Sequence, residues 1–377
     1  MIGKKIRQMP RALAIPASPA LHALSALLAL SALLALSLAG CARGPEKVAD
    51  RSPNVVLIVL ESLRADHLGC YGYGRATSPV LDAFAEGAIR YANAHAVTSW
   101  TLPSHVSILT GEYPAVHGVT EPDHSLADEF ETLAERLAGG GDPASGRPPR
   151  YETAAFVSAP FLRRPYNLQQ GFAIYDDEAA SPTNVEGHAD VTNPVIEAKV
   201  MDYLANRSGG PFFLYVHLWD IHFDYIPPPP FDTMFVDDSC EPFAITEMPF
   251  NDEIRPGMSP ARLRYLISQY DGEIRCTDAL VGRIFDRLKE RGDWDRTIVA
   301  VTSDHGEEFF EHGAKGHKKN LHGTSLRVPL LIKPAGAFEP RVIDDPFSLA
   351  TLGSRILALA GADVTPGGRF PADDTAG

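Results

Sequence analysis

Two kinds of hydrophobic segment alternate along this chain. Uninterrupted apolar runs rich in Val and Ile are typical of strands buried on both faces of a parallel sheet. Such runs predict strands at 54–60, 154–158, 212–218, 297–303 and 328–333. Segments with helical spacing predict helices at 78–86, 102–110, 126–138, 192–206, 260–291 and 348–360. This alternation predicts an α/β fold with a doubly wound, mostly parallel central sheet sandwiched by helices.

Two segments interrupt the alternation. Residues 139–150 are rich in Gly and Pro and predict a surface loop. Residues 224–258 are rich in Pro, Asp and Phe, and they follow the predicted strand 212–218. This insertion is too long for a simple connection, so it is interpreted as a flap beside a substrate site.

The N-terminus has the pattern of an export signal. A basic stretch precedes an Ala/Leu-rich apolar run at 21–38, which ends in Leu38, Ala39, Gly40 and Cys41. Residues 1–40 therefore predict a signal peptide. The small residues before Cys41 resemble a bacterial lipoprotein box, which implies lipid on the Cys41 thiol and a lipidated tether at 41–53. An uncleaved membrane anchor is the alternative. Both predict an exported, membrane-anchored protein, in the periplasm or at the cell surface.

Composition narrows the class of partner. The chain has 377 residues, 45% hydrophobic and 22% charged, with a formal net charge of −14. A general nucleic-acid binder is excluded because it would need a basic face. An anionic substrate would need a local cationic site, and a bound metal ion is the expected one. Of the cysteines after Cys41, the expected disulfide joins Cys240 and Cys276 and leaves Cys70 as a thiol.

The segment 101–105 is a candidate nucleophile site. Thr101 stands at the start of a predicted helix, with Pro103 in the first turn. A helix start presents free backbone N–H groups and the positive end of the helix dipole, which favour a bound anionic ester. A threonine there is also ordinary helix capping. The functional interpretation therefore depends on the other segments.

Polar side chains follow several predicted strands. Glu61 ends the strand 54–60, Asp304 and His305 end the strand 297–303, and His217 and His222 lie at the end of the strand 212–218. In an open α/β sheet, sites form outside the carboxyl ends of the strands. Glu61, Thr101, Asp304 and His305 are therefore the candidate ligands of one divalent metal ion. That ion would polarise a phosphoryl or sulfuryl oxygen and lower the pKa of the Thr101 hydroxyl.

Seven short segments resemble the sulfatase family of the alkaline phosphatase superfamily. They are 53–62, 64–72, 103–111, 170–172, 302–307, 311–313 and 327–330, in the family's order. The resemblance covers about Pro53 to Gly361. It implies an alkaline-phosphatase-like catalytic domain at 54–361 and a short tail at 362–377. The smaller C-terminal subdomain that family members commonly carry is expected to be short or missing.

Departures from the family pattern change the expected mechanism. Sulfatases carry a Cys or Ser that becomes formylglycine where this chain has Thr101, and an Arg where it has His105. They carry two adjacent Asp at the position of Glu61 and Ser62. The set of Glu61, Thr101, Asp304 and His305 instead resembles that of lipoteichoic acid synthases and phosphoethanolamine transferases, which implies a phosphothreonine intermediate. The donors favour zinc or manganese, with magnesium or calcium possible.

The resemblance also suggests roles for other residues. His222 and His317 match positions that contact or bind the ester, so they join Thr101 as catalytic candidates. Ser104, His105, His217 and Lys318 are candidate substrate-binding residues. Structural alternatives stay open: a helix cap for Ser104, a strand-end support for His217, and a solvated pair for Lys318 and Lys319. Asp220 with His222 could belong to a second metal site.

The sequence as a whole predicts a metal-dependent hydrolase or transferase that acts on phosphate or sulfate esters through Thr101. A phosphomonoester or phosphodiester is favoured because a metal-bound threonine suits phosphoryl transfer. The expected substrate is a small anionic ester or a glycan or lipid headgroup. The alternatives are a sulfatase that works without formylglycine and an inactive surface-binding lipoprotein.

Overall fold

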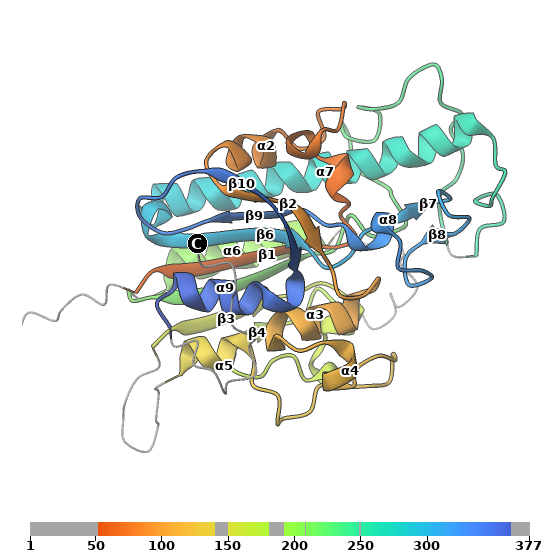
Figure 1. Ribbon diagram of the computed structural model, residues 1–377. Coiled ribbons are helices and arrows are strands. Elements are labelled where there is room, and N and C mark those ends of the chain that lie inside the picture. Colours follow the sequence, from red (N-terminus) through yellow and green to blue (C-terminus); the bar gives the residue numbers. More distant parts are fainter. Residues whose placement is uncertain (1–51, 140–149, 181–191, 208, 249, 363–377) are drawn as a thin grey trace, which may run out of the picture. The chain divides into compact units, whose positions relative to one another are not determined.

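The computed structural model describes residues 52–139, 150–180, 192–207, 209–248 and 250–362 (Figure 1). The predicted signal peptide, Cys41, nearly all of the tether and the C-terminal tail lie outside these ranges, as does most of the loop predicted at 139–150. Among the described residues, no helix combines the length and the apolarity needed to cross a membrane.

An eight-stranded mixed sheet forms the centre of the fold. Its strands are β1 (Asn54–Leu60), β2 (Ile89–His95), β3 (Glu152–Phe156), β4 (Ile174–Asp176), β5 (Phe212–Leu218), β6 (Thr297–Ser303), β9 (Leu330–Lys333) and β10 (Arg341–Ser348). They are ordered β10-β2-β9-β6-β1-β5-β3-β4. Only β9 runs antiparallel to its neighbours β2 and β6; the other pairs are parallel. The prediction of a mostly parallel sheet is confirmed.

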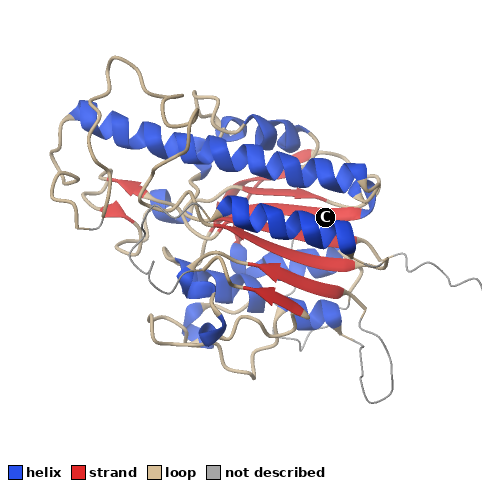
Figure 2. Cartoon of the chain, turned by 180° about the vertical axis from the view of Figure 1, so that it is seen from behind, coloured by secondary structure: helices blue, strands red, loops and turns tan. Residues whose placement is uncertain are grey.

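Helices cover both faces of this sheet (Figure 2). They are α2 (Pro79–Glu86), α3 (Thr101–Thr110), α4 (Pro114–His117), α5 (Leu133–Ala138), α6 (Asn193–Asn206), α7 (Pro260–Glu290), α8 (Gly323–Leu326) and α9 (Leu352–Leu359). Short 3-10 turns lie at Ala65–His67, Gly69–Tyr71, Pro160–Leu162, Arg164–Tyr166, Trp294–Arg296 and Leu349–Thr351. A two-stranded ribbon, β7 (Glu308–Phe309) and β8 (Lys315–Gly316), follows β6.

Alternate residues of the central strand β1 pack into two separate hydrophobic cores, one on each face of the sheet. Val55, Leu57 and Val59 pack with side chains of α3, α5 and α9, whereas Val56, Ile58 and Leu60 pack with α2, α6 and α7. All seven residues of β1 are buried, because both faces of the strand are covered. This burial on both faces explains why the strand reads as a continuous apolar run in the sequence.

The structure corrects several predicted elements. β2 and β10 pair with each other and were not predicted; the helix predicted at 126–138 is reduced to α5. α5 begins where it does because Thr132 and Glu135 form a capping box. The helix predicted at 348–360 starts as a 3-10 turn and becomes α9 at Leu352. The strand predicted at 154–158 lies two residues earlier, as β3.

The expected disulfide between Cys240 and Cys276 is wrong, since Cys70, Cys240 and Cys276 are all unpaired. Cys240 lies beside the first turns of α7, because the neighbouring Glu241 N–H donates to the carbonyl of Ala261. Cys276 lies 15 residues further along the same helix than Ala261. At ~1.5 Å per residue that separation is roughly 22 Å, far beyond the Cα separation that a disulfide spans.

Candidate active site

The carboxyl ends of β1, β5 and β6 bring the candidate residues together. Leu60 of β1 is in register with Ser303 of β6 and with Leu218 of β5. Glu61 and Asp304, each the next residue after its strand, are therefore neighbours. The Glu61 N–H extends the ladder by donating to the Leu218 carbonyl at 3.0 Å.

Thr101 lies at the same edge of the sheet but comes from a helix rather than from a strand end. It is the first residue of α3, whose N-cap is Trp100, so the sequence interpretation of Thr101 as a capping residue is wrong. The Thr101 side chain is 2% exposed and makes contacts of a different kind. Its Oγ1 donates to Glu61 Oε1 at 2.9 Å and lies 3.5 Å from His305 Nε2. The hydroxyl therefore makes no capping hydrogen bond to the helix and instead contacts Glu61 and His305 at the strand ends.

Glu61, Asp304 and His305 form a compact, fully buried cluster. Their potential ligand atoms all lie within 4.8 Å of one another. His305 Nε2 lies 3.0 Å from Glu61 Oε1 and 3.3 Å from Asp304 Oδ2. Asp304 Oδ2 is buried and makes no hydrogen bond among the described residues; its polar contacts are the Nε2 atoms of His305 and, at 3.5 Å, of His105. A buried, unsatisfied carboxylate oxygen is costly unless a cation completes it, so this donor set fits a divalent metal ion.

The ionisation of the cluster would couple metal binding to the release of a proton. Burial raises the pKa of Glu61, but hydrogen bonds from His217 and His305 outweigh burial and hold that pKa well below its usual value. Burial lowers the pKa of His305, but Asp304 and Glu61 raise it to about 9. Binding of a metal ion would therefore displace a proton from His305.

Three residues predicted to bind substrate lie beneath this cluster. Ser104 Oγ donates to the Asp304 carbonyl at 2.5 Å, and His217 Nε2 lies 3.0 Å from Glu61 Oε2. His105 Nδ1 pairs with the Tyr215 hydroxyl, and its Nε2 lies 3.5 Å from Asp304 Oδ2. Ser104, His105 and His217 are completely buried. This placement suits them to hold Glu61 and Asp304 in position rather than to touch a substrate.

His105 and His217 also form a second potential ligand trio, with Glu61 as the shared member. The rings of His105 and His217 contact each other edge to face, 4.9 Å between centroids. Burial lowers the pKa of His105, which favours the neutral ring that could accept a hydrogen bond or ligate a metal.

A cavity of about 440 Å³ opens above the cluster. Its lining residues are Trp100, Thr101, Phe161, Trp219, His222, Phe223, Met248, Lys315, Gly316, His317, Lys318 and Lys319. Thr101 is the member that joins the cavity to the buried cluster. Lys318 lies at the same wall: its N–H donates to the Ser99 carbonyl at 2.7 Å, and its Nζ lies 3.8 Å from the Trp100 ring centroid.

The two remaining catalytic candidates, His222 and His317, meet in this cavity with ring centroids 5.0 Å apart. His222 Nδ1 lies 2.7 Å from the Phe223 carbonyl, which assigns the proton to Nδ1 and leaves Nε2 as an acceptor. Burial and the neighbouring His317 lower the pKa of His222 to about 3, so its ring is neutral. The His317 ring also lies 4.4 Å from that of His305.

Sequence reasoning missed two residues that support His317. Glu307 is completely buried; its Oε2 lies 3.3 Å from His317 Nδ1 and accepts the Tyr225 hydroxyl at 2.8 Å. Burial raises the pKa of Glu307, but His317, His222 and Tyr225 together lower it. The position of Glu307, shortly after Asp304 and His305 in the same segment, could have identified it from the sequence. Tyr225 lies in the insertion, where nothing in the sequence pointed to a role in the site.

Asp220 has a structural role at the start of α6. Its Oδ1 accepts the Thr192 N–H at 2.8 Å, the Thr192 hydroxyl at 2.7 Å and the Asn193 N–H at 3.1 Å. Within the described ranges, Asp220 and His222 belong to no cluster of three potential metal ligands. The geometry offers no support for a second metal site at these two residues.

Known proteins resemble this chain over most of its length. The family described as Sulfatase matches residues 53–362. The multifunctional alkaline phosphatase superfamily protein PehA of Trinickia caryophylli is 26% identical over 354 residues, covering 75% of this chain and 68% of that protein. The ulvan-active sulfatase of Formosa agariphila is 27% identical over 342 residues, covering 84% of this chain and 63% of that protein.

The fold is likewise shared with solved structures. The phosphonate monoester hydrolase of Agrobacterium radiobacter superposes with a TM-score of 0.65 at 21% identity, over 82% of this chain and 74% of that one. The chain spans about two thirds of the length of the curated relatives it matches. With the family match extending over residues 53–362, this chain belongs to the sulfatase family of the alkaline phosphatase superfamily.

Proposed function

We propose that this protein cleaves anionic esters of the phosphate type, with Thr101 as the nucleophile. One observation carries the proposal. The Thr101 hydroxyl lies 2.9 Å from Glu61, at the point where a buried cluster fit for a metal ion meets a cavity lined by His222, His317 and Lys318. Membership of the sulfatase family supports an ester hydrolase.

Glu61, Thr101, Asp304 and His305 are the residues that would hold the metal ion, and the donor set favours zinc or manganese over magnesium or calcium. When bound, a divalent cation would polarise an oxygen of the ester and lower the pKa of the Thr101 hydroxyl. The unsatisfied Asp304 Oδ2 supports this assignment.

The side chains around Thr101 prepare it for attack. Glu61, whose pKa is lowered, is an ionised acceptor for the Thr101 hydroxyl. In the proposed step the Thr101 hydroxyl passes its proton to Glu61 as a bond forms between Oγ1 and phosphorus. The bond from phosphorus to the leaving oxygen breaks at the same time, and the leaving oxygen takes a proton from His317. Water then hydrolyses the phosphothreonine and returns the hydroxyl.

The two histidines of the cavity would transfer a proton and orient a reacting group. Glu307 fixes the His317 ring through Nδ1, which makes Nε2 the atom that exchanges a proton with the leaving oxygen. His222, neutral and with its Nδ1 proton held by the Phe223 carbonyl, would accept a hydrogen bond from the attacking water through Nε2. Lys318 supplies positive charge to the lining of the cavity.

The threonine at position 101 also favours a phosphate ester over a sulfate ester as the substrate. A threonine cannot be oxidised to the formylglycine aldehyde, so hydrolysis cannot proceed by C–O cleavage of an aldehyde hydrate. Direct attack by a hydroxyl is well suited to a phosphomonoester or phosphodiester. A sulfatase that works without formylglycine is the second candidate, favoured by the sulfatases among the relatives.

The test is turnover of p-nitrophenyl phosphate, bis-p-nitrophenyl phosphate and p-nitrophenyl sulfate with zinc, manganese, magnesium or calcium added. We expect kcat/KM for a phosphate ester to exceed that for the sulfate ester. Co-expression with a formylglycine-generating enzyme should change neither mass nor activity. A ratio that clearly favours the sulfate would overturn the phosphate preference. A protein with neither turnover nor stoichiometric metal would instead be a binding lipoprotein.

We further propose that the protein is exported and tethered by a lipid on Cys41, from the pattern of residues 38–41. Cys41→Ser should release the mature chain from the membrane fraction or leave the precursor unprocessed. Unchanged mass and unchanged partition in that variant would mean that the apolar segment itself is the anchor.

A further inference from the structure

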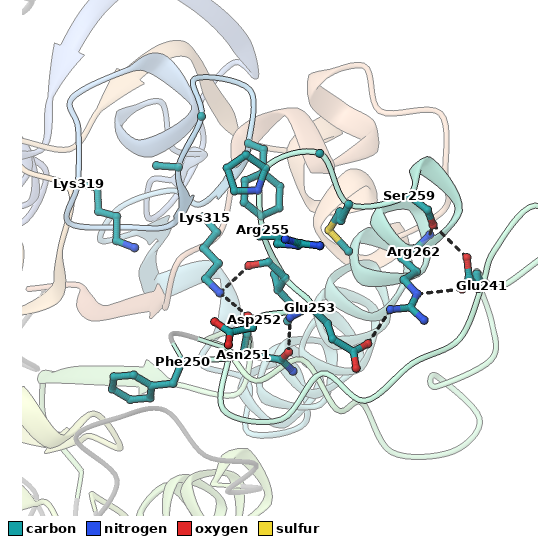
Figure 3. Close-up of a pocket in the computed structure, with 17 residues that line it drawn as sticks. Glu241, Phe250, Asn251, Asp252, Glu253, Arg255, Ser259, Arg262, Lys315 and Lys319 are labelled. Carbon is teal, nitrogen blue, oxygen red and sulfur yellow. Dashed lines mark hydrogen bonds and ion pairs between the residues drawn. The ribbon is translucent and has the colours of Figure 1, made fainter.

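A second, larger hollow adjoins the catalytic cavity. It measures about 1200 Å³ and lies between the loop 250–259, the start of α7 and the β7–β8 ribbon (Figure 3). We call it the insertion groove. Lys315 and Lys319 line both the insertion groove and the catalytic cavity, so a ligand could extend from one to the other past these two lysines.

The wall of the insertion groove is held in place by internal hydrogen bonds. Lys315 Nζ donates to the carbonyls of Asn251 at 2.9 Å and Ile254 at 2.6 Å, which joins the ribbon to the loop. Asn251 Nδ2 donates to the Ala244 and Thr246 carbonyls at 3.1 Å, and Ile254 is 1% exposed. This wall is therefore preformed rather than assembled by a ligand.

Some of the basic side chains that line the groove have no carboxylate partner. Arg262 already pairs with Glu241 at 2.9 Å and with Glu253 at 2.6 Å, which uses both carboxylates (Figure 3). Arg255 and Lys319 make no ion pair with any residue that the structure describes, and the hydrogen bonds of Lys315 go to neutral carbonyls.

Asp252 is the one carboxylate of the lining left to face those three cations. The lining as a whole has four basic side chains against three carboxylates, an excess of one positive charge in a chain whose net charge is −14. The N-terminal end of α7, where the helix dipole is positive, lies at the same groove through Ser259.

We propose that the insertion groove binds a second anionic group of the same substrate, with Arg255 as the residue that recognises it. This inference rests on the proposed function, in which the first anionic group is the ester in the catalytic cavity. The guanidinium of Arg255 can form two parallel hydrogen bonds to a phosphate, sulfate or carboxylate, and Lys319 adds charge between the two hollows. The preferred substrate is then an ester on a larger molecule that carries at least two anionic groups.

Linked anions provide a sharp test. When two groups on one ligand reach two sites at once, the second binding event is intramolecular, and affinity peaks where the linker length matches the span. The probes are α,ω-alkanediol bisphosphates of increasing length, each compared with the alkyl monophosphate of the same length. Binding is measured by calorimetry to the full chain carrying Thr101→Ala, at a fixed concentration of divalent cation.

We expect one range of lengths to bind about tenfold more tightly as the bisphosphate than as the monophosphate. Adding Arg255→Gln should remove that gain and leave the monophosphate affinity unchanged. Arg264→Gln is the matched control, since Arg264 is an exposed arginine of α7 that does not line the groove. That change should leave the gain intact.

The same series is run with alkyl sulfates and bis-sulfates. Binding of the sulfates but not the phosphates would overturn the phosphate preference, while a gain lost with Arg255→Gln would still support the groove. The inference is overturned if no length gives a gain in either series, or if Arg255→Gln and Arg264→Gln have the same effect.

Discussion

Thr101 Oγ1 lies 2.9 Å from Glu61 Oε1 and ties the first turn of α3 to the carboxyl end of β1. The two residues are 40 positions apart in the sequence. Because Glu61 is also contacted by His217 and His305, the hydroxyl is directed at a carboxylate that is already held from two sides. This relationship makes Thr101 the best place to test the chemistry.

Replacing Thr101 by Ala should abolish turnover on every active substrate, while Thr101→Ser should keep part of it. The Ala change removes one hydrogen bond but no helix cap, so the free energy of unfolding should fall by about 1 kcal/mol or less. Rates and chemical denaturation are measured on the same preparations. Thr110→Ala, at the other end of α3, is the control and should retain activity. An Ala variant with most of the wild-type rate would exclude Thr101 as the nucleophile.

Asp304→Asn should lower metal occupancy, because Asn keeps the shape of the side chain but removes the charge that the buried Oδ2 offers a cation. Elemental analysis after dialysis gives the occupancy, and EDTA should abolish activity in the unaltered protein. The control is Asp278→Asn, a buried carboxylate that accepts the Val80 and Leu81 N–H groups at the start of α2. Full activity without bound metal would refute the metal assignment.

Glu307→Gln should lower kcat more for esters with poor leaving groups than for p-nitrophenyl esters. Loss of the carboxylate removes the partner that fixes Nδ1 of His317, and general acid catalysis is worth about 10²- to 10⁴-fold where the leaving group needs a proton. The measurement is the dependence of kcat on leaving-group pKa. His317→Gln should give the same pattern.

Glu273→Gln is the control for that series. Burial raises the pKa of Glu273 well above its usual value, so Gln copies the protonated side chain. An equal loss of rate for all leaving groups in Glu307→Gln would show that Glu307 supports the fold rather than proton transfer.

His117 predicts a pH dependence of stability. Its Nδ1 accepts the Val119 N–H at 3.0 Å and its Nε2 lies 3.1 Å from Ser107 Oγ, an arrangement that requires the neutral ring. Burial lowers the pKa of His117 to about 4. The unfolded chain therefore binds more protons than the folded chain between about pH 4 and the unfolded pKa of about 6.5, and stability rises with pH across that window.

Denaturation of the full chain at several pH values checks this prediction. His117→Gln should flatten the slope between pH 4 and 6.5, whereas His124→Gln, which replaces a half-buried histidine of the neighbouring loop, should leave it unchanged. An unchanged slope in His117→Gln would show that other groups cause the acid sensitivity.

The local pattern of apolar residues was sufficient to predict the strands at the centre of the sheet. β1, β5 and β6 were predicted with their observed bounds, because strands covered on both faces must be apolar throughout. β2 was missed because polar residues interrupt its apolar ones, and β10 was missed because most of its residues are exposed. β10 pairs with β2, and β2 also pairs with β9. The antiparallel direction of β9 and the absence of the Cys240–Cys276 bridge likewise follow from distant contacts.

For the candidate site, the sequence by itself determined which residues follow strands, and the strand-end rule was enough to group Glu61, Asp304 and His305 with Thr101. Only the tertiary structure decided which atoms face the cavity. It buries His105 and His217 beneath the cluster, and it places Glu307 behind His317. The physical reason is that a residue's position after a strand is a local property of the chain. The direction of its side chain depends instead on register and packing between segments that are hundreds of residues apart.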